Sequence, residues 1–265
     1  MRKIGVNLPG PRFSMFEPEN GLQLFRQLGF DCFFSGVVPG WMERIAGTAS
    51  RNDLCWESIH APFGHMNDIW QPTEDGEKML QEILDSANEC VRYNVPILVV
   101  HLSSGENAPC VNDIGHSRFD RLVDFAVKNN IILAFENQRK LANLAFVLEV
   151  YDKVDNVRFC WDVGHEACFT PGREYMPLFG KKLAYTHIHD NHCIYNSDEH
   201  MIPFDGCIDY ERTVELLRRF DYKGSLTLEV MPKHELYKSM TPEAYFTRAR
   251  AAVERLRTML DEKGE

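Results

Sequence analysis

Histidine, aspartate and glutamate residues follow the apolar segments of this chain at six places where a strand is expected to end. The residues in these places are His60, His101, Glu136, Asp162, His165, His187 and Glu229. Imidazole and carboxylate groups together form a ligand set suited to zinc, manganese or iron. Burying so many ionisable groups without partners would cost several kcal/mol for each of them. The residue types therefore predict a divalent-metal centre, in which a carboxylate can also act as general acid or base.

Each of these residues has a structural alternative when it is considered by itself. His60 or His101 can be an ordinary hydrogen-bonded histidine of the fold. Glu136 or Glu229 can pair with a basic residue, and Asp162 can cap the helix that follows it. The metal-site interpretation therefore depends on the occurrence of all these residues together at strand ends.

Eight short apolar segments alternate with longer amphipathic ones, and we predict that these segments are the strands that position the polar residues. The predicted strands are residues 4–9, 32–37, 56–62, 96–102, 131–136, 157–163, 183–189 and 225–230. The clearest predicted helices are residues 73–93, 112–129, 209–220 and 241–260. Nearly continuous apolar strands are typical of a parallel sheet that is buried on both faces.

Eight strand–helix units without a linker predict the α/β class and, within it, a (β/α)8 TIM barrel that forms a single domain over residues 1–265. A doubly wound sheet is the alternative, but it usually carries a glycine-rich phosphate turn after its first strand, and residues 8–11 form no such turn. All strands of a barrel run parallel, so the predicted strand ends meet at one rim, where barrel enzymes place their chemistry. The longest irregular stretch, residues 191–207, follows the seventh strand, and loops of this length are often functional.

Composition excludes several other classes of protein. The apolar fraction is 44%, which argues against disorder, and 29 basic against 39 acidic residues give a formal net charge of −10. This acidic balance argues against a nucleic-acid binder. We find neither the apolar core of a signal peptide nor an apolar run of the roughly 20 residues that span a bilayer. The eight cysteines form no C-x-x-C pair, so we expect a cytoplasmic protein with reduced thiols and no membrane partner.

The order and spacing of five short motifs resemble one known family. The motifs are A-F-E-N around Glu136, D-x-x-H at 162–165, H-x-x-D at 187–190, D-x-H at 198–200 and T-L-E-V around Glu229. Over residues 4–256 the chain resembles the xylose-isomerase-like TIM-barrel superfamily. That superfamily includes sugar isomerases and epimerases and also the endonuclease-IV-type apurinic endonucleases.

The resemblance implies a role for each matching position. One divalent metal (Mn, Zn, Co or Mg) would be held by Glu136, Asp162, His187 and Glu229. The two glutamates would also be the catalytic acid/base pair. In the endonuclease branch up to three zinc ions are bound, and the additional ligands would be His60, His101, His165, Asp198 and His200. We expect the substrate to be contacted by His60, His101, His165 and Trp70.

The function that we predict is isomerisation or epimerisation of a sugar or sugar phosphate through a metal-stabilised enediolate. Three alternatives remain: a trinuclear-zinc apurinic endonuclease, an inosose dehydratase or hydroxypyruvate isomerase type of enzyme, and a non-catalytic sugar-binding member. The loop over residues 191–207 contains no Lys or Arg, so we expect no nucleic-acid partner. The sequence leaves open whether the chain forms a homo-oligomer.

Some positions depart from the pattern of particular branches. Ketohexose 3-epimerases of the family carry Arg and Glu where this chain has Cys193 and Ala142, and no strand carries the lysine of true xylose isomerases. Lys233, with His234 and Lys238 nearby, could bind a phosphate after the eighth strand. The aromatic residues that could pack on a sugar at the rim are Phe13, Phe63, Trp70 and Trp161.

Overall fold

All eight predicted strands are present in the computed structural model, which describes residues 1–11 and 17–262. The strands are β1 (Ile4–Leu8), β2 (Cys32–Gly36), β3 (Cys55–His60), β4 (Ile97–Val100), β5 (Ile132–Glu136), β6 (Val157–Asp162), β7 (Leu183–His187) and β8 (Leu226–Leu228). Their side chains are almost all buried, as expected for strands that are covered on both faces.

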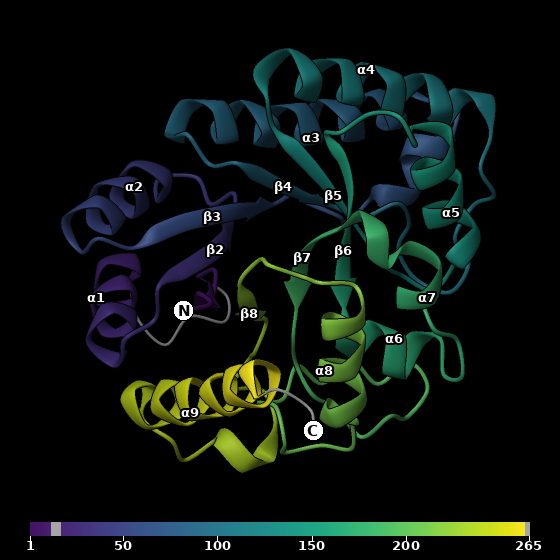
Figure 1. The fold of residues 1–265 in the computed structure, drawn as a ribbon. Helices are drawn as coiled ribbons and strands as arrows, with labels where there is room; N and C mark the ends of the chain where they lie inside the picture. The colour runs from purple at the N-terminus through teal and green to yellow at the C-terminus, as the bar shows by residue number, and fades with distance from the viewer. Residues whose placement is uncertain (12–16, 263–265) are drawn as a thin grey trace.

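Helices surround these strands (Figure 1). The α-helices are α1 (Pro18–Leu28), α2 (Met42–Arg51), α3 (Glu74–Tyr93), α4 (Asp113–Asn129), α5 (Leu141–Val150), α6 (Val163–Phe169), α7 (Met176–Phe179), α8 (Tyr210–Arg219) and α9 (Pro242–Asp261). The described residues also form three short 3-10 helices, η1 (Met66–Trp70), η2 (Gly180–Lys182) and η3 (Glu235–Tyr237). The predicted helices match α3, α4, α8 and α9 to within two residues.

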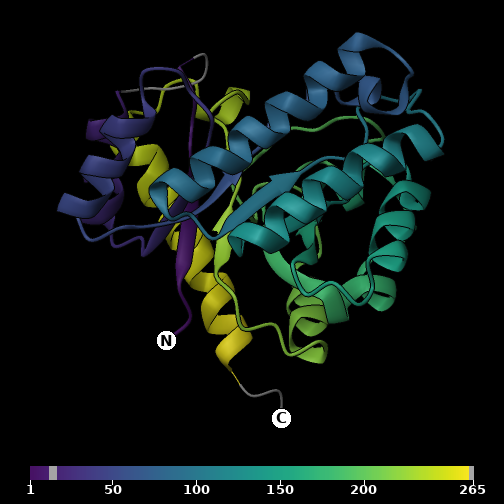
Figure 2. The ribbon, with the colours of Figure 1, turned by 90° about the horizontal axis from the view of Figure 1, so that it is seen from above.

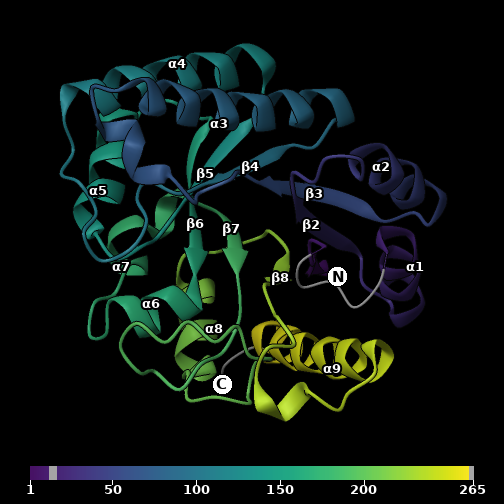
Figure 3. The ribbon, with the colours of Figure 1, turned by 180° about the vertical axis from the view of Figure 1, so that it is seen from behind.

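The strands pair in parallel in the order β7-β6-β5-β4-β3-β2-β1-β8. β7 and β8 meet through a parallel bridge between Ile188 and Leu228, so the barrel is nearly closed. The view from behind shows the same ring of helices around the strands (Figure 3), and the view from above shows α3 and α4 packed side by side (Figure 2). The prediction of a single-domain TIM barrel is therefore confirmed.

Local sequence explains where two of the long helices begin. Thr73 accepts a hydrogen bond from the Gly76 backbone N–H at the start of α3, and Asn112 caps α4 in the same way through Gly115. Short polar side chains are favoured at these positions because they satisfy backbone groups that the helix leaves unpaired. Among the described residues, no helix is long and apolar enough to cross a membrane.

The strand ends deliver the polar residues to one rim of the barrel. His60, Glu136, Asp162 and His187 are the last residues of β3, β5, β6 and β7. His101 directly follows β4, and Glu229 directly follows β8. Because the strands are parallel, all of these side chains enter the same space at the carboxyl ends of the strands.

Candidate active site

Glu136 lies at the centre of three imidazoles that come from separate strands. His101 donates to Glu136 Oε2 from Nε2 at 2.6 Å, and the Nε2 of His60 lies 3.3 Å from the same oxygen. His187 donates to Oε1 from Nδ1 at 2.9 Å. Glu136 is only 1% exposed. The structure thus brings three predicted ligands around one buried carboxylate.

His187 connects the two predicted catalytic carboxylates. Its Nδ1 lies 2.9 Å from Glu136 Oε1 and 3.2 Å from Glu229 Oε2. The ring of Phe34 stacks on the imidazole with 4.6 Å between centroids and fixes its plane. The ends of strands β5, β7 and β8 therefore meet at a single imidazole, where both carboxylates approach the same nitrogen atom, Nδ1 of His187.

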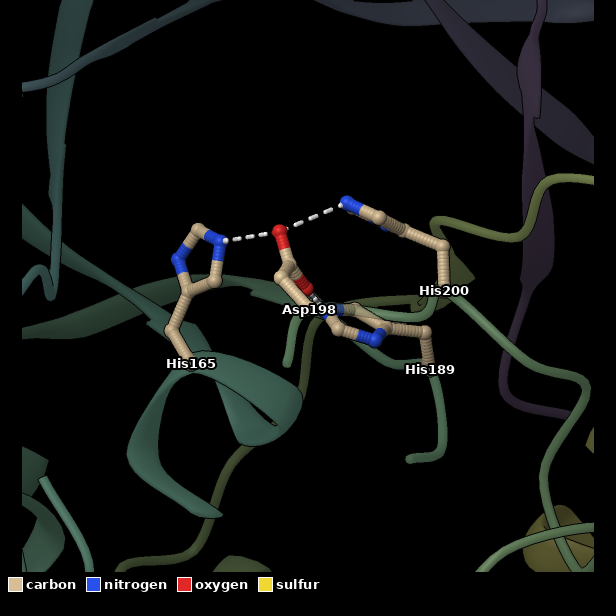
Figure 4. Close-up of side chains that lie close together, drawn as sticks. All are labelled: His165, His189, Asp198 and His200. Atoms are coloured by element: carbon tan, nitrogen blue, oxygen red, sulfur yellow. Dashed lines mark ion pairs between the residues drawn. The ribbon is translucent and has the colours of Figure 1, made fainter. Parts of the chain in front are cut away.

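A second cluster combines three imidazoles with Asp198 (Figure 4). Asp198 Oδ2 lies 3.0 Å from His200 Nε2 and 3.5 Å from His165 Nε2. His189 lies below them, with its Nε2 3.6 Å from Asp198 Oδ1. The sequence analysis named His165, Asp198 and His200 as possible ligands but missed His189. The spacing His187-x-His189 was the available signal, because alternate residues of an extended segment face the same side.

Asp162 lies in the second cluster, and the two clusters approach each other where His165 Nδ1 lies 3.6 Å from Glu136 Oε1. The Oδ1 atom of Asp162 accepts the backbone N–H of His165 at 2.6 Å, which caps α6, and lies 3.2 Å from His189 Nε2. Its Oδ2 lies 3.8 Å from His165 Nδ1. Asp162 thus caps α6, as the structural alternative in the sequence analysis proposed. The same carboxylate also faces the imidazoles of His165 and His189.

Gly164 makes room for His189 at the start of α6. A Cβ atom at Gly164 would lie 2.0 Å from the Cε1 atom of His189, well inside van der Waals contact. We expect Gly164→Ala to displace this imidazole and to lower the free energy of unfolding by about 1–3 kcal/mol, as overpacking typically does. Denaturant unfolding checks this, with Gly64→Ala as the matched control, because a Cβ there has no neighbour within 4 Å among the described residues. Equal stability of the two variants would contradict the steric argument.

Several buried polar atoms of these clusters have no hydrogen-bond partner within the described residues. They are Asp162 Oδ2, His187 Nε2, His189 Nδ1, His189 Nε2 and Asp198 Oδ1. Leaving such atoms unpaired is costly, and all are of the types that coordinate divalent metals. The groups His60–His101–Glu136, His60–His187–Glu229 and His165–His189–Asp198–His200 each bring their ligand atoms within 4.8 Å of one another. The residues therefore fit a divalent metal.

The imidazoles and carboxylates of the site stabilise each other's charged forms. Burial alone would raise the pKa of Glu136, but the imidazoles of His187 and His101 hold it well below its ordinary range. Burial alone would lower the pKa of His165, but carboxylates, with Asp162 first among them, raise it to about 10. Protonated imidazoles thus balance buried carboxylates here. A divalent cation can supply the same positive charge, and its binding would release those protons.

The segment after β5 holds the imidazoles in place. The side-chain amide of Gln138 lies 3.2 Å from His101 Nε2 and 3.0 Å from His165 Nδ1. Tyr175 in turn donates its hydroxyl to the Gln138 backbone oxygen at 2.8 Å. Gln138 was not predicted, although the run of three polar residues from Glu136 to Gln138 at the end of an apolar strand was a visible signal in the sequence.

A cavity of about 1170 Å³ opens above these residues. Its lining includes His60, His101, His165, Asp198, His200 and Glu229, together with Phe34 and Phe63. Glu229 therefore faces the cavity, whereas Glu136 lies beneath the imidazoles. The aromatic prediction for Phe63 agrees with this lining, and Phe13 lies outside the described residues.

Trp70 and Trp161 are not among the described residues that line the cavity. Trp70 is 1% exposed, its indole N–H donates to the Leu102 oxygen at 2.8 Å, and its ring packs on Phe119. Trp161 is 2% exposed and donates to Glu166. Both rings are core residues, and the expected substrate contact of Trp70 is corrected, because its ring is turned into the core between the barrel and its helices.

In the part of the chain that the structure describes, the three basic residues that were considered as a phosphate site after the eighth strand do not face the central cavity. Lys238 pairs with Glu235, and His234 Nε2 lies 3.9 Å from Glu199. Lys233 is partly exposed. None of these three basic residues lines the cavity as far as the chain is described.

Comparisons with known proteins agree with the fold. The family model described as "Xylose isomerase-like TIM barrel" matches residues 21–259. An uncharacterised protein of Sinorhizobium fredii is 28% identical over 206 residues, which cover 72% of this chain and 63% of that protein. The chain thus spans less than two thirds of this relative.

Solved structures show the same fold. The D-psicose 3-epimerase of Clostridium cellulolyticum, solved with D-tagatose, superposes with a TM-score of 0.76 at 14% identity, covering 97% of this chain and 99% of that one. The 3-keto-D-glucoside 4-epimerase of E. coli gives a TM-score of 0.74 at 17% identity, covering 97% of this chain and 100% of that one. At these identities the likeness shows the fold alone.

Proposed function

Because this chain belongs to the xylose isomerase-like TIM-barrel family, we propose that it is a divalent-metal-dependent isomerase or epimerase of a sugar or sugar phosphate. The observation that carries this proposal is the pair of buried carboxylates, Glu136 and Glu229, on one imidazole below a large cavity. Proton transfer next to a carbonyl needs such positioned acid and base groups. The solved structures with this fold that act on sugars support the same chemistry.

Glu136 and Glu229 are the proposed acid/base pair. The imidazole of His187 lowers the pKa of both carboxylates, although burial opposes this, so both are ionised at neutral pH. An ionised carboxylate is the state that a general base requires, and the carboxyl group that has taken up the proton is then the acid that returns one to carbon. Glu229 lines the cavity and can take the proton of a bound sugar directly. Glu136 lies one layer deeper and is fixed by His101 and His187.

The proposed metal ligands are Glu136, Asp162, His187 and Glu229. A divalent ion bound there would act as a Lewis acid that polarises the carbonyl and hydroxyl oxygens of the substrate. The remaining imidazoles, His60, His101 and His165, line the cavity and can hydrogen-bond sugar hydroxyl groups. The rings of Phe34 and Phe63 can pack against the apolar face of a sugar.

Exchange of a carbon-bound hydrogen with solvent tests this proposal whatever the product of the reaction is. The metal-loaded protein is incubated in D2O with a panel of aldoses, ketoses and their phosphates, and deuterium next to the carbonyl is followed by proton NMR. We expect catalysed exchange with at least one member of the panel. Metal-loaded protein that exchanges no hydrogen in any of them would contradict the proposal.

Hydrolysis at abasic sites in DNA is the second candidate, because the structure also groups the further endonuclease-type ligands. His60 and His101 share Glu136, and His165, His200 and Asp198 lie together. The part of the cavity that α2 and α3 line argues against DNA, since its described residues carry four carboxylates, Glu43, Glu82, Asp85 and Glu89, against one cation, Arg92, which pairs with Glu43 and Glu89. These carboxylates would repel a phosphate backbone.

We therefore expect negligible binding of abasic duplex DNA at physiological salt. A band-shift titration at two salt concentrations checks this, with undamaged duplex as control. A salt-sensitive shift that is specific to the abasic duplex, together with strand cleavage, would favour the nuclease function over the isomerase.

A further inference from the structure

A second hollow, of about 670 Å³, lies beside the central cavity. Arg139 and Phe169 line both of them, so the two spaces adjoin at these side chains. Arg139 directly follows Gln138, whose amide contacts the imidazoles of the candidate active site. A ligand held at those imidazoles therefore has the second hollow as its neighbouring space.

A stack of three side chains runs from the active site to this hollow. The ring of Phe169 stacks on the imidazole of His165 at 4.6 Å, and the guanidinium carbon of Arg139 lies 3.5 Å from the centroid of Phe169. The guanidinium carbon of Arg139 is therefore no farther from the ring centre of His165 than the sum of these two distances. This distance is comparable to the length of a five- or six-carbon sugar chain. Stacking also pre-orients the guanidinium plane, because cation–π contact restrains it over the ring.

The second hollow is basic, although the chain as a whole is acidic. Arg139, Lys140 and Arg173 line it, with Glu106 as the one carboxylate among its described lining residues. Across residues 1–11 and 17–262, none of the three cations forms an ion pair with a carboxylate. Arg139 donates from Nε at 3.0 Å and from Nη2 at 2.5 Å to the neutral amide oxygen of Asn196, and Lys140 donates to a backbone oxygen. Their charge is therefore available to an anionic ligand.

The start of α5 adds backbone donors to the same space. Lys140 is the N-cap residue and makes no side-chain capping bond, and Leu141 and Ala142 of the first turn also line the hollow. The positive end of a ten-residue helix thus faces the hollow that the three cations line.

We propose that this hollow binds the phosphate group of a phosphorylated sugar, an inference that rests on the proposed sugar chemistry of the central cavity. Three cations against one carboxylate match a phosphate dianion better than a neutral hydroxyl group. The Arg139 guanidinium, held against the ring of Phe169, keeps the N–H groups of Nη1 beyond those that bind Asn196, and these can donate to phosphate oxygens. The sugar carbonyl would then lie at the imidazoles and carboxylates, with the phosphate beyond Phe169.

Binding of inorganic phosphate to the purified full-length protein tests the site directly. Calorimetric titration compares the wild type with Arg139→Gln and the double variant Arg139→Gln/Arg173→Gln. We expect each to weaken phosphate binding at least tenfold. Lys153→Gln, at an exposed position after α5, removes one positive charge elsewhere and should change affinity less than twofold. Arg139→Lys keeps the charge and should restore part of the affinity if the variants are folded.

Four results would overturn the inference. They are no saturable phosphate binding, binding that is insensitive to Arg139 and Arg173, loss of binding in Lys233→Gln instead, and acetate that binds as tightly as phosphate. Kinetics give a second readout on any phosphorylated sugar that exchanges hydrogen. Arg139→Gln should raise its KM at least tenfold while kcat stays within about threefold.

Failure of this inference and failure of the proposed function are distinguishable. Turnover of unphosphorylated sugars without phosphate binding overturns the phosphate site and leaves the isomerase proposal intact. Phosphate binding that depends on Arg139, without turnover of any sugar, supports the site and contradicts the isomerase proposal.

Discussion

Glu136→Gln and Glu229→Gln are each expected to lower turnover by at least about a hundredfold, the usual effect of removing a general acid or base. Glutamine keeps the size of the side chain but cannot accept a proton from carbon. Glu136 would also lose the charge that holds the imidazoles of His101 and His187 at 2.6 and 2.9 Å. Steady-state kinetics on a substrate found by deuterium exchange measures the loss.

The two variants should differ in their stability, although both should lose turnover. Glu229 lines the cavity, whereas Glu136 is buried below it among imidazoles. We therefore expect both variants to weaken metal binding, since both carboxylates are proposed ligands, and Glu136→Gln also to lower stability, because it leaves the buried imidazoles of His101 and His187 without their charged partner. Glu149→Gln, on the exposed side of α5, is the matched control and should retain wild-type rates. Near-wild-type turnover in both active-site variants would contradict the two-glutamate mechanism.

Removal of divalent metal by a chelator is expected to abolish turnover and to lower the melting temperature. The physical reason is the set of buried carboxylate and imidazole atoms without partners in the described chain, which a bound ion would satisfy. Metal at a hundred times its Kd stabilises the folded state by about 2.7 kcal/mol, which corresponds to a rise of about 5–10 °C. Thermal unfolding with and without added Mn²⁺, Co²⁺, Mg²⁺ or Zn²⁺ measures this.

His187→Ala should remove most of that metal-dependent shift, because the Nδ1 atom of His187 lies close to both proposed catalytic carboxylates. His116→Ala removes an imidazole that pairs with Asp120 on the outer helix α4, and should leave the shift unchanged. Elemental analysis gives the stoichiometry. About one ion per chain agrees with the isomerase proposal, and about three zinc ions would favour the nuclease. Turnover that is indifferent to chelation would contradict a metal enzyme.

The positions of the proposed catalytic groups could be predicted because they depend on local pattern. Strands such as β4 and β5 are continuous apolar runs, and His101 and Glu136 stand at their ends. Parallel strands bring such ends together whatever the details of packing. The period of two along an extended segment would also have identified His189, had it been applied beyond His187.

Side-chain direction was not predictable in the same way. Trp70 and Phe63 are both aromatic residues in the segment that follows β3, yet Trp70 packs on Phe119 and Phe63 lines the cavity. Which aromatic ring faces a ligand depends on how η1 and α4 pack around it. That packing is a long-range property, because the indole of Trp70 is held by a backbone oxygen at Leu102.

The sequence by itself determined the (β/α)8 barrel and placed the ionisable residues at one rim. The alternation of strands with helices and the end of each strand depend on residues that are close together in the sequence. Only the tertiary structure decided that Glu136 and Glu229 share His187, that Gln138 contacts two imidazoles, and that Arg139 stacks on Phe169. These contacts join segments tens of residues apart. Their geometry depends on strand register and on the path of each loop, which no local pattern encodes.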